Sequence, residues 1–274
     1  EMDFRETTHS WFSIDEGYAP VYSRDSRSNT KVEMPGMRIR PALPADRKLE
    51  NLILKDLPSD LRESLDTALR PVVLQKEQFL YQEGDDLEYV YFPVTAVVSE
   101  FKILEDGRMV EIAVTGREGA VGLSSIFSDS HTAPNCTQVS QAGTALRIDT
   151  ESFERLIKNN DELRASLSHF VDLYIRQISQ KAICNMYHSV KERLCTWLLM
   201  VHDRCGRSTL NLTHEQIART LGVYRPSITC IAQELRSKKL INYSRGGISI
   251  VDRQKVEQAA CTCYFEVGCS VPSL

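Results

Sequence analysis

The chain has 274 residues, of which 42% are hydrophobic, and it carries a formal net charge of −4. This length allows about two domains, and the hydrophobic fraction is sufficient for packed cores. No apolar run approaches the roughly eighteen residues that a membrane span requires, and no basic segment followed by an apolar one opens the chain. We therefore expect a cytoplasmic protein with neither a membrane segment nor a secretory signal.

Residues 1–48 are rich in Ser, Thr, Arg, Asp and Pro and show no sustained periodicity. This composition predicts a flexible leader, with local order only near Trp11 and Phe12, and a partner-binding tail is the alternative. A helical pattern then extends from Asn51 to Leu69, with a break at Pro58.

Between Pro71 and Asp149 the pattern changes to short runs rich in Val, Ile, Phe and Tyr. Turn residues separate these runs, which are VVL, FLY, YVYF, AVVSEFKIL, VEIAV, TQVSQ and TALRI. Many short strands at near-even spacing predict a closed or double-sheet β domain over residues 49–160. Residues 72–164 contain sixteen Asp or Glu against eight Lys or Arg, so we do not expect this domain to contact DNA.

Helical periodicity returns at Asp149 and Thr150, which begin a short helix, and a longer helix follows over residues 161–187. Apolar side chains recur along the longer helix at spacings of three and four, at Leu163, Leu167, Phe170, Tyr174 and Ile178. Such a seam packs either against a partner helix or against the helix's own domain. A third helix is expected from Val190 to Asp203.

The run from Leu210 to Ser237 has the features of two short helices joined by a tight turn. Thr213 and Gln216 have capping-box spacing, Gly222 can end the first helix in the left-handed region, and Pro226 can begin the second. The outer face of the second helix carries polar side chains, namely Arg225, Ser227, Thr229, Gln233 and Arg236. This pattern is typical of a helix-turn-helix whose second helix enters a DNA major groove, and an ordinary helical hairpin is the alternative.

Two short alternating runs around Arg245-Gly246-Gly247 follow and predict a β-hairpin, the wing of a winged helix over residues 188–260. Residues 207–257 carry nine Lys or Arg against four Asp or Glu, an excess of positive charge that a phosphate-contacting surface requires. A last helical stretch is expected after Gln254. Residues 261–274 are expected to form a tail.

An acidic β domain, a long helix and a basic winged helix, in this order, resemble the Crp/Fnr family of bacterial transcription regulators. The resemblance covers about residues 51–260 and is most specific in LTHEQIARTLGV, RPSITCIAQELRSKKLI and the wing that ends in ISIVD. It implies an α+β protein with a cyclic-nucleotide-binding-like jelly roll and a dimer formed through the seam of residues 161–187. It further implies near-palindromic double-stranded operator DNA as the target, with RNA polymerase as a possible further partner.

The family's recognition helix often opens with Arg, Glu and a hydroxyl residue, with a second Arg one turn later. Arg225 and Ser227 match this pattern, whereas Pro226 and Cys230 replace the Glu and the second Arg. The resemblance therefore implies a guanine contact for Arg225 but an operator that differs from the family's typical sequence. The remaining expected DNA contacts are Tyr224, Thr229, Gln233 and Arg236 on the second helix and, at phosphates, Thr213, Arg219, Lys238 and Arg245.

The family's cyclic AMP site uses an Arg beside a small or hydroxyl residue and a Glu just after a Gly. Here Leu123 follows the matching Gly122, and residues 130–136 contain no Arg. Backbone N–H groups from Gly119 through Val121 to Leu123 could still form an anion nest, which defines a weak candidate effector pocket. We expect no cofactor, and a cyclic nucleotide, another ligand or no ligand at all are the open alternatives.

The cysteines are spread along the chain, which favours reduced thiols over a disulfide framework. The N-terminal cysteine cluster of iron–sulfur family members is missing, since the first cysteine is Cys136. Cys261 and Cys263 could join a metal site, but no four ligands at zinc spacing are visible, so no metal site is expected. A thiol sensor at Cys184, at Cys230 or at the Cys261/Cys263 pair is the alternative.

The sequence shows no Gly-rich phosphate loop, nucleophile elbow or metal-ligand helix, so no catalytic residue is assigned and no enzyme is expected. We predict a homodimeric, sequence-specific DNA-binding regulator of transcription. A cyclic-nucleotide-binding module that acts on a protein partner is the alternative.

Overall fold

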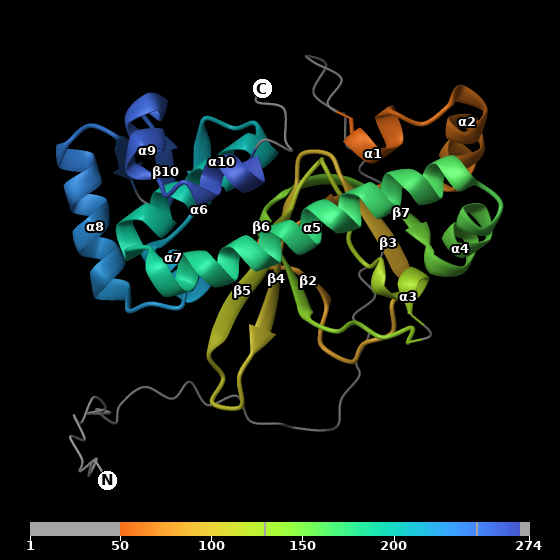
Figure 1. Cartoon of the computed structure of the whole chain (residues 1–274), viewed down its shortest axis with the longest axis horizontal. Coiled ribbons are helices and arrows are strands. Elements are labelled where there is room, and N and C mark those ends of the chain that lie inside the picture. Colours follow the sequence, from red (N-terminus) through yellow and green to blue (C-terminus); the bar gives the residue numbers. More distant parts are fainter. Residues whose placement is uncertain (1–49, 129, 245, 269–274) are drawn as a thin grey trace, which may run out of the picture.

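The computed structural model of the chain describes residues 50–128, 130–244 and 246–268. The leader expected over residues 1–48 therefore lies outside the described residues. Figure 1 shows a β domain and a mainly helical C-terminal domain, with the long helix α5 (Asp161–Tyr187) running along both. Within the described residues, no helix is long and apolar enough to cross a membrane.

Two antiparallel sheets form the β domain, with the strand orders β1-β7-β3 and β2-β6-β4-β5. Their strands coincide with the apolar runs of the sequence. They are β1 (Arg70–Leu74), β2 (Phe79–Tyr81), β3 (Tyr89–Pro93), β4 (Val97–Ile103), β5 (Met109–Thr115), β6 (Cys136–Gln141) and β7 (Gly143–Asp149). Since each sheet buries one face against the other, the prediction of a double-sheet domain is confirmed.

Four short helices accompany the sheets, namely α1 (Leu52–Lys55), α2 (Ser59–Ala68), α3 (Ser124–Phe127) and α4 (Thr150–Lys158). Pro58 separates α1 from α2, and the Asp149 side chain caps α4 by accepting a hydrogen bond from the Ser152 N–H at 2.8 Å. The sequence predicted both of these boundaries. Phe153 of α4 packs edge-on against Phe92 of β3, with ring centroids 5.4 Å apart.

The first half of α5 belongs to the core of the β domain. Leu163 and Leu167 are fully buried there, Phe170 is 7% exposed, and Tyr174 packs beside them. The predicted dimer contact is therefore wrong for Leu163, Leu167 and Phe170, since their apolar surface is already covered within one chain, whereas Tyr174 is half-buried. Ile178, the last residue of the seam, is half-buried.

The C-terminal domain contains α6 (Val190–Cys205), β8 (Thr209–Asn211), α7 (His214–Leu221), α8 (Arg225–Ser237), β9 (Ile241–Ser244), β10 (Gly247–Ile250), α9 (Arg253–Ala259) and α10 (Cys263–Gly268). The predicted hairpin β9–β10 forms the wing, and β8 adds a third strand in the order β8-β10-β9. The sequence did not reveal β8, because three residues are too few to show a period.

The segment after α9 differs from the tail that the sequence suggested. Cys261, Cys263 and Tyr264 are buried, and α10 packs against α5 and α6. The Tyr264 hydroxyl donates a hydrogen bond to Asp203 Oδ2 at 2.8 Å and accepts one from Arg253 at 2.6 Å. Burial raises the pKa of Asp203, but hydrogen bonds from His202, Arg253 and Tyr264 outweigh it and lower this pKa to about 2.

A buried carboxylate on β5 joins the two domains. The Glu111 side chain is fully buried, and its Oε1 lies 2.6 Å from Lys181 Nζ of α5 and 3.0 Å from Trp197 Nε1 of α6. Ser99 Oγ of β4 donates to Oε2 at 2.6 Å. Around this group, Val97 and Val114 share one hydrophobic core with α6, α7 and α8. The β domain and the winged helix are therefore packed together without an intervening solvent layer.

The edge of the larger sheet also contacts α5 through the amide side chain of Gln177. Gln177 Oε1 accepts a hydrogen bond from the Val114 N–H at 2.7 Å, and its Nε2 donates to the Val114 carbonyl at 3.1 Å. Gln177 thus supplies the pair of bonds that a neighbouring strand would otherwise make to this residue of β5.

We expect Glu111→Ala to lower the free energy of unfolding by about 3 kcal/mol, because it leaves the Lys181 ammonium and the Trp197 N–H without their buried acceptor. Urea unfolding followed by tryptophan fluorescence measures this change. Glu105→Ala, at an exposed site in the β4–β5 turn, is the matched control and should have little effect. Equal stability of the two variants would contradict the assigned role of Glu111.

Candidate nucleic-acid interface

The helix-turn-helix is built by local signals that the sequence contains. Thr213 Oγ1 accepts a hydrogen bond from the Gln216 N–H, and the Gln216 side chain accepts one from the Thr213 N–H, which completes the predicted capping box. Gly222 ends α7 at φ 64° and ψ 41°, a left-handed conformation that disfavours a side chain. Pro226 lies in the first turn of α8. These three predictions are confirmed.

The outer face of α8 is open to solvent at the edge of the molecule (Figure 1). Tyr224 is 81% exposed at the N-cap of α8, and Ser227 and Gln233 are also exposed. The Arg225 guanidinium lies 3.9 Å from Glu215, in an exposed pair that contributes little to stability. The guanidinium can therefore leave this carboxylate for another acceptor at small cost.

Thr229 is less available for contact with DNA than the sequence suggested. Its hydroxyl donates to the Arg225 carbonyl at 3.2 Å and lies 3.2 Å from His214 Nδ1 of α7. Burial and the nearby Arg225 charge lower the pKa of His214, which keeps the imidazole neutral at pH 7. Thr229 thus links the two helices of the motif.

The wing is held against α8 by aromatic contacts. The Arg236 guanidinium stacks 5.1 Å above the Tyr243 ring of β9, and the His214 ring contacts the same tyrosine with centroids 5.1 Å apart. A groove of about 380 Å³ lies between the start of α7, the start of α8 and the wing. Thr213, Glu215 and Arg225 line this groove together with residues of the wing, so one guanidinium and one carboxylate face it.

Two of the expected phosphate contacts have other partners in the structure, and a third lies outside the described residues. Arg219 points to the β domain, where its guanidinium lies 3.7 Å from Glu77, beside a Gln216–Glu77 hydrogen bond of 2.6 Å. Lys238 pairs with Glu234 of its own helix at 2.7 Å. Arg245 lies outside the described residues.

The weak effector pocket expected at residues 119–123 is occupied by the protein's own contacts. The Gly119 N–H donates to the Gly116 carbonyl, and the Val121 N–H donates to the Tyr91 carbonyl at 2.8 Å. A Cβ atom at Gly119 would lie 2.1 Å from the Phe170 ring, so α5 packs directly onto this turn. Val121 and Leu123 are buried, and Gly122 adopts φ 90°. The first two donors of the proposed anion nest are therefore unavailable.

The structure also brings together residues that sequence spacing kept apart. Cys184 and His188, at the end of α5, lie beside Cys261 and Cys263, and their ligand atoms are all within 4.8 Å of one another. The sequence showed only the Cys261/Cys263 pair, because the other two residues are more than seventy positions away. Cys230, a candidate thiol sensor, is exposed on α8 and does not belong to this group of four residues.

A double-sheet domain of the cyclic-nucleotide-binding type, joined by a long helix to a winged helix-turn-helix, defines a class of DNA-binding transcription regulators. Residues 71–160 match the family model of the cyclic nucleotide-binding domain, and residues 192–259 match that of the Crp-like helix-turn-helix domain. Together with the relatives described next, these matches show that the chain belongs to the Crp/Fnr family.

The relatives agree with this assignment. The chain is 22% identical to the anaerobic regulatory protein of Bacillus subtilis over 214 residues, 76% of this chain and 90% of that protein. It is 21% identical to a CRP-like cAMP-activated global transcriptional regulator of Mycobacterium tuberculosis, over 72% of this chain and 91% of that protein. The solved structure of FixK2 from Bradyrhizobium japonicum superposes with a TM-score of 0.60 at 18% identity, over 71% of this chain and 98% of that one.

Thr213 offers a test that separates helix capping from DNA contact. We expect Thr213→Ala to lower the free energy of unfolding by about 1 kcal/mol through the loss of the cap. Thr213→Asp keeps a capping oxygen and should retain stability, but its negative charge at the groove should weaken binding to random duplex DNA. Urea unfolding measures the effect on stability, and fluorescence anisotropy measures the effect on DNA binding. Unchanged DNA affinity of Thr213→Asp would mean that DNA does not contact the groove at Thr213.

Proposed function

We propose that this family member binds a near-palindromic operator as a homodimer and regulates transcription from it. The observation that carries the proposal is the uncovered outer face of α8, where Tyr224, Arg225, Ser227 and Gln233 are exposed beside the wing. A helix presented in this way can enter a major groove, and a dimer would place two such helices about 34 Å apart on one face of the duplex.

Arg225 is the residue we assign to base recognition. It occupies the first turn of α8, where a guanidinium can donate two hydrogen bonds to guanine O6 and N7. Pro226 and Cys230 offer neither the carboxylate nor the second guanidinium typical of the family. The operator should therefore differ from the typical one, with Tyr224 and Gln233 supplying further contacts.

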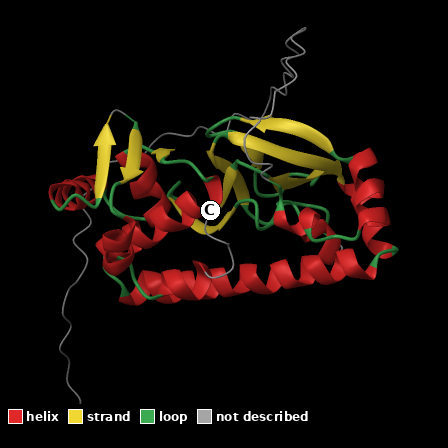
Figure 2. Cartoon of the chain, turned by 90° about the horizontal axis from the view of Figure 1, so that it is seen from above, coloured by secondary structure: helices red, strands yellow, loops and turns green. Residues whose placement is uncertain are grey.

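The dimer interface that we propose lies on the outer side of α5, opposite the seam that the β domain covers. Ile175, Ile183 and Met186 are 56%, 47% and 75% exposed, at helical spacings of eight and three. Figure 2 shows α5 along one edge of the molecule, with no other described element on its outer side. An apolar row of this kind on a long helix is the surface that a second copy could cover.

For the β domain we propose a role that does not use the family's cyclic AMP contacts. The Mycobacterium tuberculosis relative is named as cAMP-activated, but this chain offers no Arg in residues 130–136 and no Glu after Gly122. The Gly119 and Val121 N–H groups already donate hydrogen bonds within the protein, which also supports a β domain that does not bind cyclic AMP in the family's way.

The proposal is tested by selecting bound sequences from a random duplex library with the purified full chain, with and without cyclic AMP, cyclic GMP and an oxidant. Recovery of a near-palindrome is the expected result, and an additive that sharpens enrichment identifies the class of signal. Binding that does not weaken as salt rises would overturn the DNA assignment, because phosphate contacts release counterions.

On the recovered operator, Arg225→Ala should weaken specific binding by about 1–3 kcal/mol, while binding to random DNA changes little. Arg225→Lys should restore the charge but not the two-bond contact, so specificity should remain low. Fluorescence anisotropy with both duplexes measures these effects, and Arg108→Ala, on the exposed β4–β5 turn, is the control. An equal loss on both duplexes would make Arg225 a phosphate contact only.

Replacing both Ile175 and Ile183 with Glu should raise the dimer dissociation constant by about 100-fold or more, because four carboxylates would face one another in the interface. Sedimentation velocity measures the oligomeric state. Val73→Glu, at a partly exposed apolar site on β1, is the matched control and should remain dimeric. An intact dimer of the double variant would move the interface away from this face of α5.

A further inference from the structure

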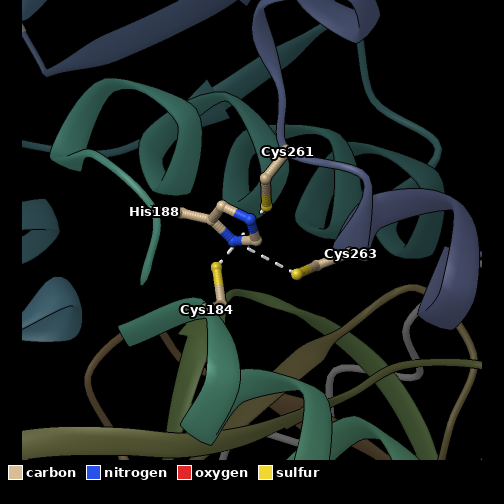
Figure 3. Close-up of side chains that lie close together, drawn as sticks. All are labelled: Cys184, His188, Cys261 and Cys263. Carbon is tan, nitrogen blue, oxygen red and sulfur yellow. Dashed lines mark hydrogen bonds between the residues drawn. The ribbon is translucent and has the colours of Figure 1, made fainter. Parts of the chain in front are cut away.

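Four metal-ligating side chains converge where the long helix ends. Cys184 belongs to the last turn of α5, and His188 is at the C-cap of that helix. Cys261 lies just before α10, and Cys263 is the first residue of α10. Figure 3 shows all four side chains pointing toward one another. Neither the DNA-binding face nor the dimer face uses these groups.

The distances fit a single tetrahedral ion. Cys184 Sγ and Cys261 Sγ are 3.5 Å apart, and Cys263 Sγ is 3.3 Å from His188 Nδ1. Around one zinc ion with four ligands, neighbouring sulfur and nitrogen atoms are separated by about 3.6–3.8 Å. All pairs in this group already lie within 4.8 Å, so only small side-chain shifts would complete the coordination.

The surroundings suit thiolate ligands. The three cysteines are buried and pack as a cluster of their own, while His188 is half-buried. Gln180 Nε2 donates a hydrogen bond to Cys263 Sγ at 3.0 Å. Thr196 Oγ1 accepts a hydrogen bond from the Cys261 N–H at 3.1 Å. The Thr196 hydroxyl proton can then be donated to Cys261 Sγ, which lies 3.0 Å from Oγ1. Such outer donors orient and stabilise metal-bound sulfurs.

We propose that Cys184, His188, Cys261 and Cys263 bind one zinc ion in a closed, structural site. Three thiolates and one imidazole are a ligand set of structural zinc sites, and four protein ligands leave no position open for a substrate. A cluster of several irons would require its ligands to lie farther apart than they do here. The site ties the end of α5 to α10 and so fixes the C-terminal domain at the junction between α5 and α6.

The consequence for DNA rests on the proposed function, whereas zinc binding itself does not. The zinc joins the helix that we assign to dimer contact to the domain that we assign to operator contact. Loss of the ion would release α10 from α5 and so loosen the relative placement of two recognition helices. Metal binding is measured without DNA, so failure of one proposal is distinguishable from failure of the other.

The test uses the full chain, purified under reducing conditions from cells supplied with zinc, and elemental analysis of its metal content. One zinc ion per chain is expected. Cobalt added to the metal-free chain should give the intense visible bands and thiolate charge-transfer absorption of a tetrahedral thiolate site. Iron in place of zinc, or no bound metal together with no cobalt spectrum, would overturn the proposal.

Variants localise the site. Cys263→Ser and His188→Ala should weaken zinc binding by more than about 100-fold, a larger loss than outer partners cause. His188→Cys keeps four ligands and should retain the ion, and Cys205→Ser, at a buried thiol outside the cluster, should also retain it. Because His188 is only half-buried, its variants should fold even if Cys263→Ser does not. Full zinc content in both Cys263→Ser and His188→Ala would place the ion elsewhere.

Discussion

The arrangement of this protein depends on one buried carboxylate. Glu111 projects from β5 into the region where the β domain, α5 and α6 meet, and its oxygens accept hydrogen bonds from Lys181, Trp197 and Ser99. Burial of a carboxylate is costly unless its oxygens accept hydrogen bonds from other groups. The β domain, α5 and α6 are therefore held in one relative position. Beside this carboxylate, Val97 and Val114 of the β domain belong to the hydrophobic core of the C-terminal domain. Because these contacts of Glu111 are specific, the outer face of α8 has a fixed direction relative to α5.

The sequence predicted those features that depend on neighbours along the chain. The capping residues Thr213 and Gln216, the turn at Gly222 and the restart at Pro226 each fix the backbone through local sterics or hydrogen bonds. The strands of the β domain were predictable for a similar reason, since a short run rich in Val, Ile, Phe and Tyr, bounded by turn residues, marks each one. The candidate recognition residues followed from the same local pattern, because a buried face on α8 determines which face remains outside.

Features that depend on distant partners were not predictable in this way. Periodicity shows that Leu163, Leu167 and Phe170 form a stripe, but it does not show whether the β domain or a second chain covers it. The group of Cys184, His188, Cys261 and Cys263 was also not predictable, because its members come from two segments that meet only in the folded chain. The orientation of Arg219 toward Glu77 also depends on the packing of α7 against the β1–β2 turn.

The bond pair between Gln177 and Val114 has a consequence for how the protein behaves at high concentration. β5 is the outermost strand of the larger sheet, and an unpaired edge strand is a template onto which another molecule can add a strand. The Gln177 amide occupies the backbone groups of Val114, and α5 lies across this part of the edge. Self-association by sheet extension is thereby opposed at this edge of the larger sheet.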